Sequence, residues 1–547
     1  MHCYSAYIPP PMSALRSLLC LLLMSSPAVA QVTTPERTGN RQTSSQQQVL
    51  AFLDTLERRT PDLRSWTLTL SPEGRRVPVV LAARPMVDGP AAALRSGKPI
   101  VYLQANIHAG EVEGKEAAQM LLRDLTVGAL KPLLDSVILL VVPIYNADGN
   151  DHFAPGEVNR PGQNGPSPVG ERANGQGYDL NRDYVKQEAP ETRASLALIE
   201  RWDPDVFIDL HTTNGSYHGY LLTYSPGLNP NSPPANDYVR DFFLPTIRER
   251  MRQRHHQETF WYGNFRNQTP DSLVQGWETY DPRPRFGTNL MGMRGRYSIL
   301  SEAYSNAPFG DRISVTYNFV REILSLVAYE RDVMNRLALI PEPQPPSPIP
   351  DSVVVRSVMA PPTMQDVVAE LTELEGDGAG PFAHRRRTGV YRTIRMPVFD
   401  RFTALRKEAL PAGYLIPAPY ADLVDLLLTQ GIVVERLRTP WAGNLEAFSV
   451  DTVSAARFPF EGHRAVTIEG HWSTRADSAR SGSFFVPASQ QLGVLAAYLL
   501  EPASEDGFVT WGFLDRGLRA RTWYPIRRVR QPLIADLEMV LRPEGNQ

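Results

Sequence analysis

Hydrophobic residues along the chain form short unbroken runs that alternate with segments of helical periodicity. The runs at 99–106 and 136–144 are rich in β-branched residues and carry almost no charge, which is typical of strands buried on both faces. Residues 206–210 and 297–300 repeat this pattern. Because helical segments separate the runs, the pattern predicts an α/β fold with a mixed or largely parallel central sheet and helices on both faces.

Three segments between the predicted strands have apolar residues at helical spacing. They are residues 118–125, 239–247 and 319–334, and each spacing predicts an amphipathic helix with one buried face. In the second segment this face is predicted to contain Val239, Phe242, Phe243 and Ile247. Together with the strands, these helices predict an α/β domain over residues 45–338.

The segments flanking this domain differ in composition. Residues 31–60 are rich in Thr, Gln, Ser and Arg, which predicts a loose leader. Six prolines between Pro341 and Pro350 predict a semi-stiff linker at 339–352. Residues 353–547 are predicted to form a smaller accessory α/β domain of unknown role.

The accessory domain is predicted from two similar patterns. A short strand ends at Pro417 and another at Pro487, and an apolar helix-like run follows each of them. These strand–proline–helix units are typical of a small α/β domain.

The first 30 residues have the features of a secretory signal peptide. Arg16 precedes an apolar run at 18–24, and small residues at 28–30 favour cleavage after Ala30. We therefore expect a secreted or periplasmic protein. The run is shorter than the roughly 20 residues that span a bilayer, and no later run is long enough, so the mature chain is expected to have no membrane span.

Charge and cysteine content exclude several classes of function. The chain has 56 basic and 59 acidic residues, a net charge of −3, so no nucleic-acid partner is expected. Its two cysteines, Cys3 and Cys20, lie in the predicted signal peptide. The mature chain should therefore have neither a disulfide framework nor a cysteine nucleophile.

Reactive side chains follow the predicted strands. His108 and Glu111 come after the strand at 99–106, and His211 ends the strand at 206–210. Two histidines and one glutamate form a common catalytic zinc set that leaves one position open for water. By itself the H-x-x-E pattern is weak, and a single histidine at a strand end is equally typical of a hydrogen-bonded core residue.

Two further clusters carry polar residues. One is the segment 178–184, with the sequence YDLNRDY, and the other is Glu302, which directly follows an apolar strand. An unpaired buried carboxylate is energetically unfavourable, so Glu302 needs a partner or a function. In α/β sheets, ligands bind beyond the carboxyl ends of the strands, where these clusters lie.

Taken in order, these clusters resemble the M14 family of zinc carboxypeptidases over residues 75–335. The family pattern of H-x-x-E followed by a distant histidine corresponds to His108, Glu111 and His211. Its N-P-D-G turn corresponds to residues 146–149, with alanine in place of proline, and its D-x-N-R motif to residues 179–182.

The resemblance implies a role for each residue in the reaction. One Zn²⁺ per chain would be bound by His108, Glu111 and His211. Glu302 would take the proton of the attacking water. Arg172 would stabilise the oxyanion, with Arg160 as the alternative.

The resemblance also implies how a substrate would bind. Asn181 and Arg182 would bind its free carboxylate, and Asp179 would orient the first zinc histidine. Tyr280 would cover the bound substrate, with Tyr262 as the alternative.

The chain is thus expected to be an exported zinc metallocarboxypeptidase acting on a peptide or amide substrate with a free carboxylate. The alternatives are a zinc amidase or peptidoglycan peptidase of the same fold, and a binding protein without catalysis. Side-chain preference, the choice between a protein tail and a cell-wall peptide, and oligomeric state stay open. The Glu-Gly-His segments at 461–463 and 469–471 are not expected to bind metal.

Overall fold

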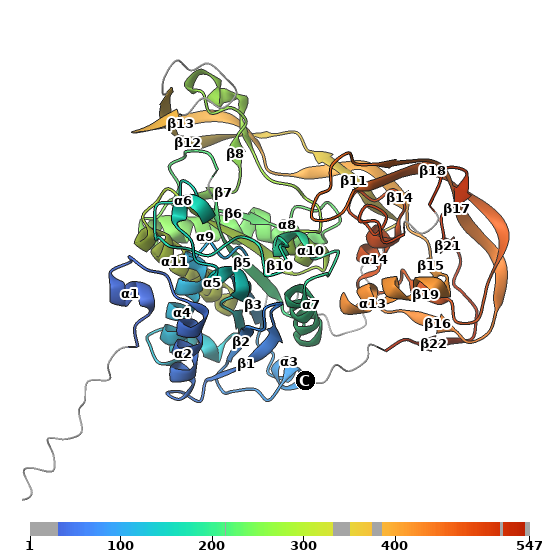
Figure 1. Cartoon of the computed structure of the whole chain (residues 1–547), viewed down its shortest axis with the longest axis horizontal. Coiled ribbons are helices and arrows are strands. Elements are labelled where there is room, and N and C mark those ends of the chain that lie inside the picture. The colour runs from blue at the N-terminus through green and yellow to red at the C-terminus, as the bar shows by residue number, and fades with distance from the viewer. Residues whose placement is uncertain (1–30, 214, 332–349, 375–384, 515–517, 542–547) are drawn as a thin grey trace, which may run out of the picture. The chain divides into compact units, whose positions relative to one another are not determined.

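The fold is organised around a central eight-stranded sheet (Figure 1). The structure, a computed structural model of the chain, describes residues 31–213, 215–331, 350–374, 385–514 and 518–541. The predicted signal peptide and most of the predicted proline-rich linker lie outside these ranges. In the described part, no helix has the length and hydrophobicity needed to cross a membrane.

The central sheet contains the four predicted buried strands. The strand order is β1-β2-β4-β3-β5-β10-β6-β7. β3 pairs in parallel with β4 and β5, and β5 in parallel with β10, whereas β1, β2 and β6 pair antiparallel. The predicted mixed sheet is therefore confirmed. The bounds are β1 Leu63–Leu70, β2 Arg76–Ala82, β3 Ile100–Ala105, β4 Ile138–Val142, β5 Val206–Thr213, β6 Leu222–Pro226, β7 Thr259–Trp261 and β10 Tyr297–Tyr304.

Helices cover both faces of this sheet. Alternate residues of β3 belong to different hydrophobic clusters, since Tyr102 packs in one and Val101 and Leu103 in the other. The cluster around Tyr102 also contains α7 and α10, and the cluster around Val101 contains α2, α4, α9 and α11. The bounds are α4 Glu113–Thr126, α7 Pro190–Trp202, α9 Leu244–Arg250, α10 Gly287–Met293 and α11 Phe309–Tyr329.

The three predicted helices are present, with two differences. The segment 239–247 is divided between a π-helical turn and α9, and Phe242, expected on its buried face, is 63% exposed. Val239, Phe243 and Ile247, spaced four residues apart, supply the buried stripe instead. The third helix, α11, is described to Tyr329, and the end predicted at Met334 lies outside the described residues.

Residues 31–60 are helical and packed, in contrast to the predicted loose leader. α1 (Thr34–Thr38) and α2 (Gln46–Glu57) both begin with a capping box. Val49, Leu53 and Leu56 of α2 are buried in the cluster that contains α4 and α11. This apolar stripe is short and lies in a sequence dominated by polar residues, so composition alone obscured the helix.

From residue 350 onward, the described chain first forms two antiparallel strand pairs. β11 (Ser352–Met359) pairs with β14 (Phe402–Ala409), and β12 (Thr363–Leu374) pairs with β13 (Arg385–Phe399). β13 also pairs with β9 (Trp277–Glu278), which places the β12–β13 hairpin beside β8 (Asn264–Phe265) in Figure 1.

The remaining residues form a second large sheet. The order of its main path is β18-β17-β21-β15-β19-β16-β22. Both strand–proline–helix units are present: β15 is followed by α13, and β19 by α14. Around them the region is richer in strands than the sequence pattern predicted. The bounds are β15 Gly413–Ile416, α13 Ala421–Thr429, β16 Glu435–Leu437, β17 Trp441–Ala455, β18 Val466–Ala479, β19 Phe484–Pro487, α14 Gly493–Leu500, β21 Arg527–Val529 and β22 Leu537–Met539.

Candidate active site

The predicted metal ligands lie at the carboxyl ends of two adjacent parallel strands. His108 and Glu111 occupy the tight turn between β3 and α4, and His211 lies near the end of β5. In this turn the Glu111 N–H donates to the His108 carbonyl at 2.9 Å. A side chain at Gly110 would collide with Arg160 and with the Gly170 carbonyl. The turn therefore brings both ligands close to β5.

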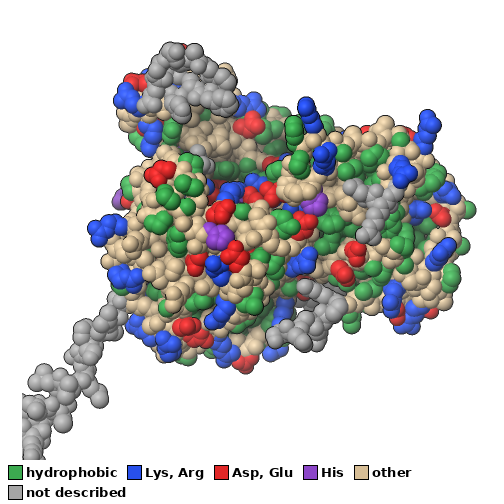
Figure 2. Space-filling model, in the orientation of Figure 1, with side chains coloured by type: hydrophobic (Ala, Val, Ile, Leu, Met, Phe, Trp, Pro, Cys, Tyr) green, Lys and Arg blue, Asp and Glu red, His purple; other side chains and the backbone are tan. Residues whose placement is uncertain are grey.

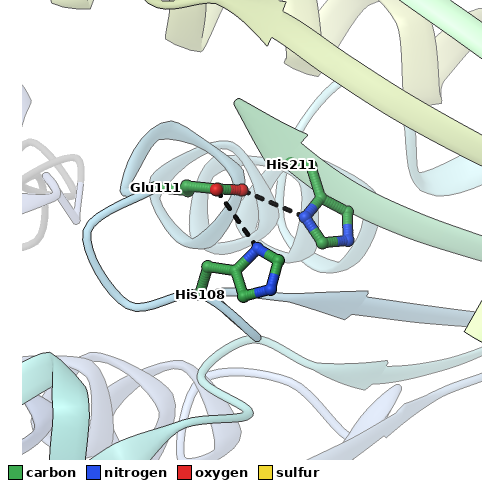
Figure 3. Close-up of side chains that lie close together, drawn as sticks. All are labelled: His108, Glu111 and His211. Carbon is green, nitrogen blue, oxygen red and sulfur yellow. Dashed lines mark hydrogen bonds and ion pairs between the residues drawn. The ribbon is translucent and has the colours of Figure 1, made fainter. Parts of the chain in front are cut away.

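The three side chains point toward one another (Figure 3). Nδ1 of His108 is 3.1 Å from Glu111 Oε1, and Nδ1 of His211 is 3.0 Å from Oε2 of the same carboxylate. One ligand atom from each residue lies within 4.8 Å of the other two, and all three residues are buried. Two imidazole nitrogens and a carboxylate fit the ligand preference of Zn²⁺, and three ligands leave a position open.

A carboxylate supports the outer nitrogen of each histidine. His108 Nε2 is 2.9 Å from Asp179 Oδ1. His211 Nε2 is 3.0 Å from Asp209 Oδ2. Such partners fix the orientation of a ligating imidazole so that its other nitrogen faces the metal.

Asp209 was not assigned a role from the sequence, although its spacing from His211 carried a signal. Residues two apart on a strand point to the same face. Asp209 is fully buried, so its carboxylate lies beneath the histidine with no exposure to solvent.

Glu302 lies on β10, opposite His211 in the parallel register. Its side chain is 8% exposed. Burial, together with the neighbouring Glu111 carboxylate, raises the pKa of Glu302 to about 8, although His211 and Arg160 act in the opposite direction. A carboxyl group with a pKa near neutrality can both accept and release a proton.

Both candidate arginines lie beside Glu111. Arg160 is buried, and it donates to Glu111 Oε1 at 3.1 Å and to the Thr212 carbonyl at 2.9 Å. Arg172 donates through Nε and Nη2 to Asp179, and its Nη1 is 3.5 Å from Glu111 Oε1. Its side chain is 42% exposed. Arg172 thus has the more accessible guanidinium.

The substrate-binding candidates lie close to the predicted metal ligands. Asn181 Nδ2 is 3.3 Å from His211 Nε2, and the Arg182 guanidinium lies over the Phe286 ring at 4.3 Å. The rings of Tyr262 and Tyr280 meet edge to face at 5.5 Å. With the exception of Asp179, all the site residues predicted from the sequence line one cavity of about 280 Å³.

Asp179 connects the predicted metal ligands to the candidate substrate-binding residues. It contacts His108 and Arg172, and it accepts the Asn181 N–H at 2.9 Å. Burial alone would raise the pKa of Asp179, but His108, Arg182 and Arg172 together hold it well below its usual range. Asp179 is therefore a permanent negative charge at this position.

A buried ion pair beneath the site was also missed by the sequence analysis. Arg312 is fully buried, and its Nε donates to Glu113 Oε2 at 3.3 Å. Its Nη1 donates to the carbonyls of Asn164, Ser305 and Ala307. Arg312 thereby ties the loop after Arg160 to the end of β10.

The segment 179–188 also contacts the C-terminal region at several points. Asp179 N–H donates to Glu461 Oε2 at 3.2 Å, and His463 Nε2 is 2.8 Å from Glu188 Oε1. Gln430 Nε2 donates to the Tyr184 carbonyl at 2.7 Å. The described residues from Thr33 onward form one compact unit. The Glu-Gly-His segment at 461–463 thus lies against the candidate site.

Two histidines and a glutamate at the carboxyl ends of neighbouring strands form a ligand set that is typical of zinc hydrolases. Residues 49–279 match the family model described as zinc carboxypeptidase, Peptidase_M14. This match includes the three predicted metal ligands and the segment 179–182, and it confirms the resemblance to zinc carboxypeptidases found in the sequence.

Several relatives are similar to this chain. Carboxypeptidase 2 of Trichophyton equinum is 23% identical over 492 residues, which cover 84% of this chain and 81% of that protein. Human carboxypeptidase D is 32% identical over 124 residues, 20% of this chain and 9% of that protein. A metallo-carboxypeptidase from Burkholderia cenocepacia covers 53% of this chain and 70% of its own, with 18% identity and a TM-score of 0.39. The fungal match extends far beyond residue 279 and thus includes much of the C-terminal region.

Proposed function

We propose that the protein is an exported zinc metallocarboxypeptidase that hydrolyses the C-terminal peptide bond of its substrate. The observation that carries this proposal is that one cavity holds a metal-ligand set, a buried glutamate and an Asn181-Arg182 pair. These groups are the ones needed to activate water and to bind a free carboxylate.

His108, Glu111 and His211 would bind one Zn²⁺ per chain. When bound, the ion lowers the pKa of a water molecule and polarises the scissile carbonyl. The carboxylates of Asp179 and Asp209 hold the two imidazoles in the orientation that this requires.

Glu302 would take the proton from the attacking water and deliver it to the leaving amine. Its burial and its place opposite His211 in the pairing of β10 with β5 support this role. A cation bound nearby would stabilise the carboxylate form of Glu302 and lower its pKa, which favours its action as a base.

Arg172 would stabilise the negative charge that develops on the carbonyl oxygen. Its exposed guanidinium supports this choice, whereas Arg160 is held by Thr212 as well as by Glu111. Arg160 would then act mainly to hold Glu111 in place.

Asn181 and Arg182 would bind the substrate carboxylate. The Asn181 side chain is fixed because its Oδ1 accepts the Gly287 N–H at 3.0 Å, and Arg182 stacks on Phe286. Tyr280 would cover the bound substrate; its ring packs against Phe286, and its hydroxyl donates to Asn289 Oδ1 at 3.3 Å.

Export is proposed from the sequence of the first 30 residues, with cleavage after Ala30. Expression of the full chain with its signal, followed by N-terminal sequencing of the external protein, tests this point. A first residue of Gln31 is expected, and retention of the uncleaved chain inside the cell would contradict it.

The activity is tested with matched peptides that end in a free carboxylate or in an amide. We expect release of the last residue from the free peptide only, because the amidated end offers Arg182 no carboxylate. Cleavage of both would instead favour the amidase or endopeptidase alternative, and cleavage of neither would favour a binding protein. Metal analysis should find about one zinc per chain in the wild type and almost none in His108→Ala.

A further inference from the structure

The strands β17 and β18 are joined by a long loop that contains a tight turn. Phe460 and His463 exchange two backbone hydrogen bonds, of 2.7 and 3.0 Å. The two residues between them, Glu461 and Gly462, have φ angles of 50° and 78°. Two central residues with positive φ define a type I′ turn.

Glutamate is a poor local choice at this position. The first central residue of a type I′ turn is usually Asn, Asp or Gly, because these adopt positive φ at little cost. A longer side chain at Glu461 adds backbone strain. Strain of this kind points to a requirement set outside the turn itself.

The carboxylate of Glu461 reaches out of the turn to the candidate site. Its Oε2 accepts the N–H of Asp179 at 3.2 Å, and its backbone carbonyl accepts from Lys186 Nζ at 3.4 Å. The Glu461 carboxylate also lies close enough to the Arg182 guanidinium for the two opposite charges to attract each other. A charged acceptor on a backbone N–H makes a stronger bond than a neutral one.

The bonded N–H belongs to the residue from which the carboxylate-binding segment begins. Asp179 caps the short helical turn Leu180–Arg182, which carries Asn181 and Arg182. A shift of this backbone would move both side chains relative to the metal ligands, because Asp179 itself is held to His108.

We propose that Glu461, contributed by the C-terminal region, is a positioning residue that holds the Asp179 backbone and thereby fixes Asn181 and Arg182 for binding of the substrate carboxylate. The kinetic part of this proposal rests on the proposed carboxypeptidase function. The structural part, that Glu461 orders residues 179–188, does not depend on it.

The test compares two substitutions in the full-length, zinc-loaded enzyme. Glu461→Asn suits the turn better but is too short to reach Asp179, whereas Glu461→Gln keeps the length and a neutral acceptor. Glu469→Asn is the matched control, because this acid lies on β18 and pairs with Arg356 and Arg406, both within the C-terminal region.

For Glu461→Asn we expect an unchanged or higher melting temperature and KM raised about fivefold for the free-carboxylate peptide, with kcat changed less than about twofold. Hydrogen–deuterium exchange in the peptide covering 179–188 should become several times faster. In Glu461→Gln, KM and the exchange rate across 179–188 should both stay close to the wild-type values. In Glu469→Asn, both should equal those of the wild type.

The proposal is overturned if exchange across 179–188 is the same in Glu461→Asn and the wild type. It is equally overturned if Glu461→Asn lowers kcat while KM stays constant. If the wild type fails to hydrolyse the peptide, the proposed function fails, but the exchange measurement still decides whether Glu461 holds the segment.

Discussion

The central sheet and the C-terminal sheet bury their strands in different ways. In the central sheet every residue of β3, β5 and β10 is buried. In the C-terminal sheet, the last five residues of β17 are all exposed, and only two residues of β18 are buried. One sheet is thus enclosed between helices, and the other presents much of its surface to solvent (Figure 1).

This difference assigns different tasks to the two regions. At the carboxyl ends of the enclosed strands, the buried side chains of His108, His211 and Glu302 line one cavity. A solvent-facing sheet with long strands can extend a turn toward a neighbour, as β17 and β18 do with Glu461. Figure 2 shows acidic and basic side chains mixed over the visible face. The first region therefore carries the candidate catalytic residues, and the second contacts and orders a segment next to them.

The largest expected effect lies at the reacting centre. Glu302→Gln keeps the shape of the side chain but removes the base, so kcat should fall about 10³-fold. Zinc content should stay at the wild-type level, because Glu302 is not among the predicted ligands. Activity within tenfold of the wild type would show that another group takes the proton.

The second effect tests whether the two regions are held together by a buried ion pair. Asp506 is fully buried and accepts bonds from Arg285 N, Nε and Nη2 and from Trp511 Nε1. Asp506→Ala leaves the Arg285 charge buried and unpaired, so the free energy of unfolding should fall by about 3 kcal/mol. Urea denaturation measures this value, and a loss below about 1 kcal/mol would mean that Arg285 is readily solvated.

A third effect concerns pH and the helix α7 of the first region. Burial raises the pKa of Glu191 to about 7, although hydrogen bonds to the carboxylate act in the opposite direction. A carboxyl group with a raised folded-state pKa stabilises the fold below its unfolded pKa, and this contribution is lost as the pH rises through about 7. Because glutamine does not ionise, Glu191→Gln should not show this loss of stability with rising pH.

The stability of Glu191→Gln relative to the wild type should therefore increase by about 2 kcal/mol between pH 5 and pH 8. Urea denaturation at both pH values provides the measurement. Glu200→Gln is the control on the same helix, because Glu200 is exposed. If the free energy of unfolding changed equally between pH 5 and pH 8 in both variants, Glu191 would ionise freely in the folded protein.

The smallest effect is expected on the β12–β13 hairpin. Arg386 and Glu373 form an ion pair in which the side chains are 64% and 59% exposed. Glu373→Gln should change the free energy of unfolding by less than about 0.5 kcal/mol. A change as large as that of Asp506→Ala would remove the distinction between buried and exposed pairs.

The sequence predicted the central sheet and the residues gathered at its edge because both depend on local patterns. An apolar run identifies a buried strand, and a polar residue directly after it lies at the strand end, as His211 does. The helix α2 was missed because Val49, Leu53 and Leu56 form a narrow stripe among polar residues. The composition of the whole segment does not show these three buried positions.

Glu461 could not be predicted because its contact joins residues far apart in the chain. The pairing depends on the register of β17 with β18 and on the packing of their turn against Asp179. Neither is visible as a periodicity. The Glu-Gly-His segment was considered only as a metal site, and its proximity to the substrate-binding segment emerged from the fold alone.

The hydrogen bonds between the C-terminal region and residues 179–188 limit how chimeras of related enzymes can be built. α13 and the turn at 461 hold this segment from two directions, through the Leu426 carbonyl, Gln430 and Glu461. A chimera that joins this catalytic sheet to another protein's C-terminal half would lose these partners even if both halves fold. Productive recombination would need a crossover that transfers the segment 179–188 together with its contacts.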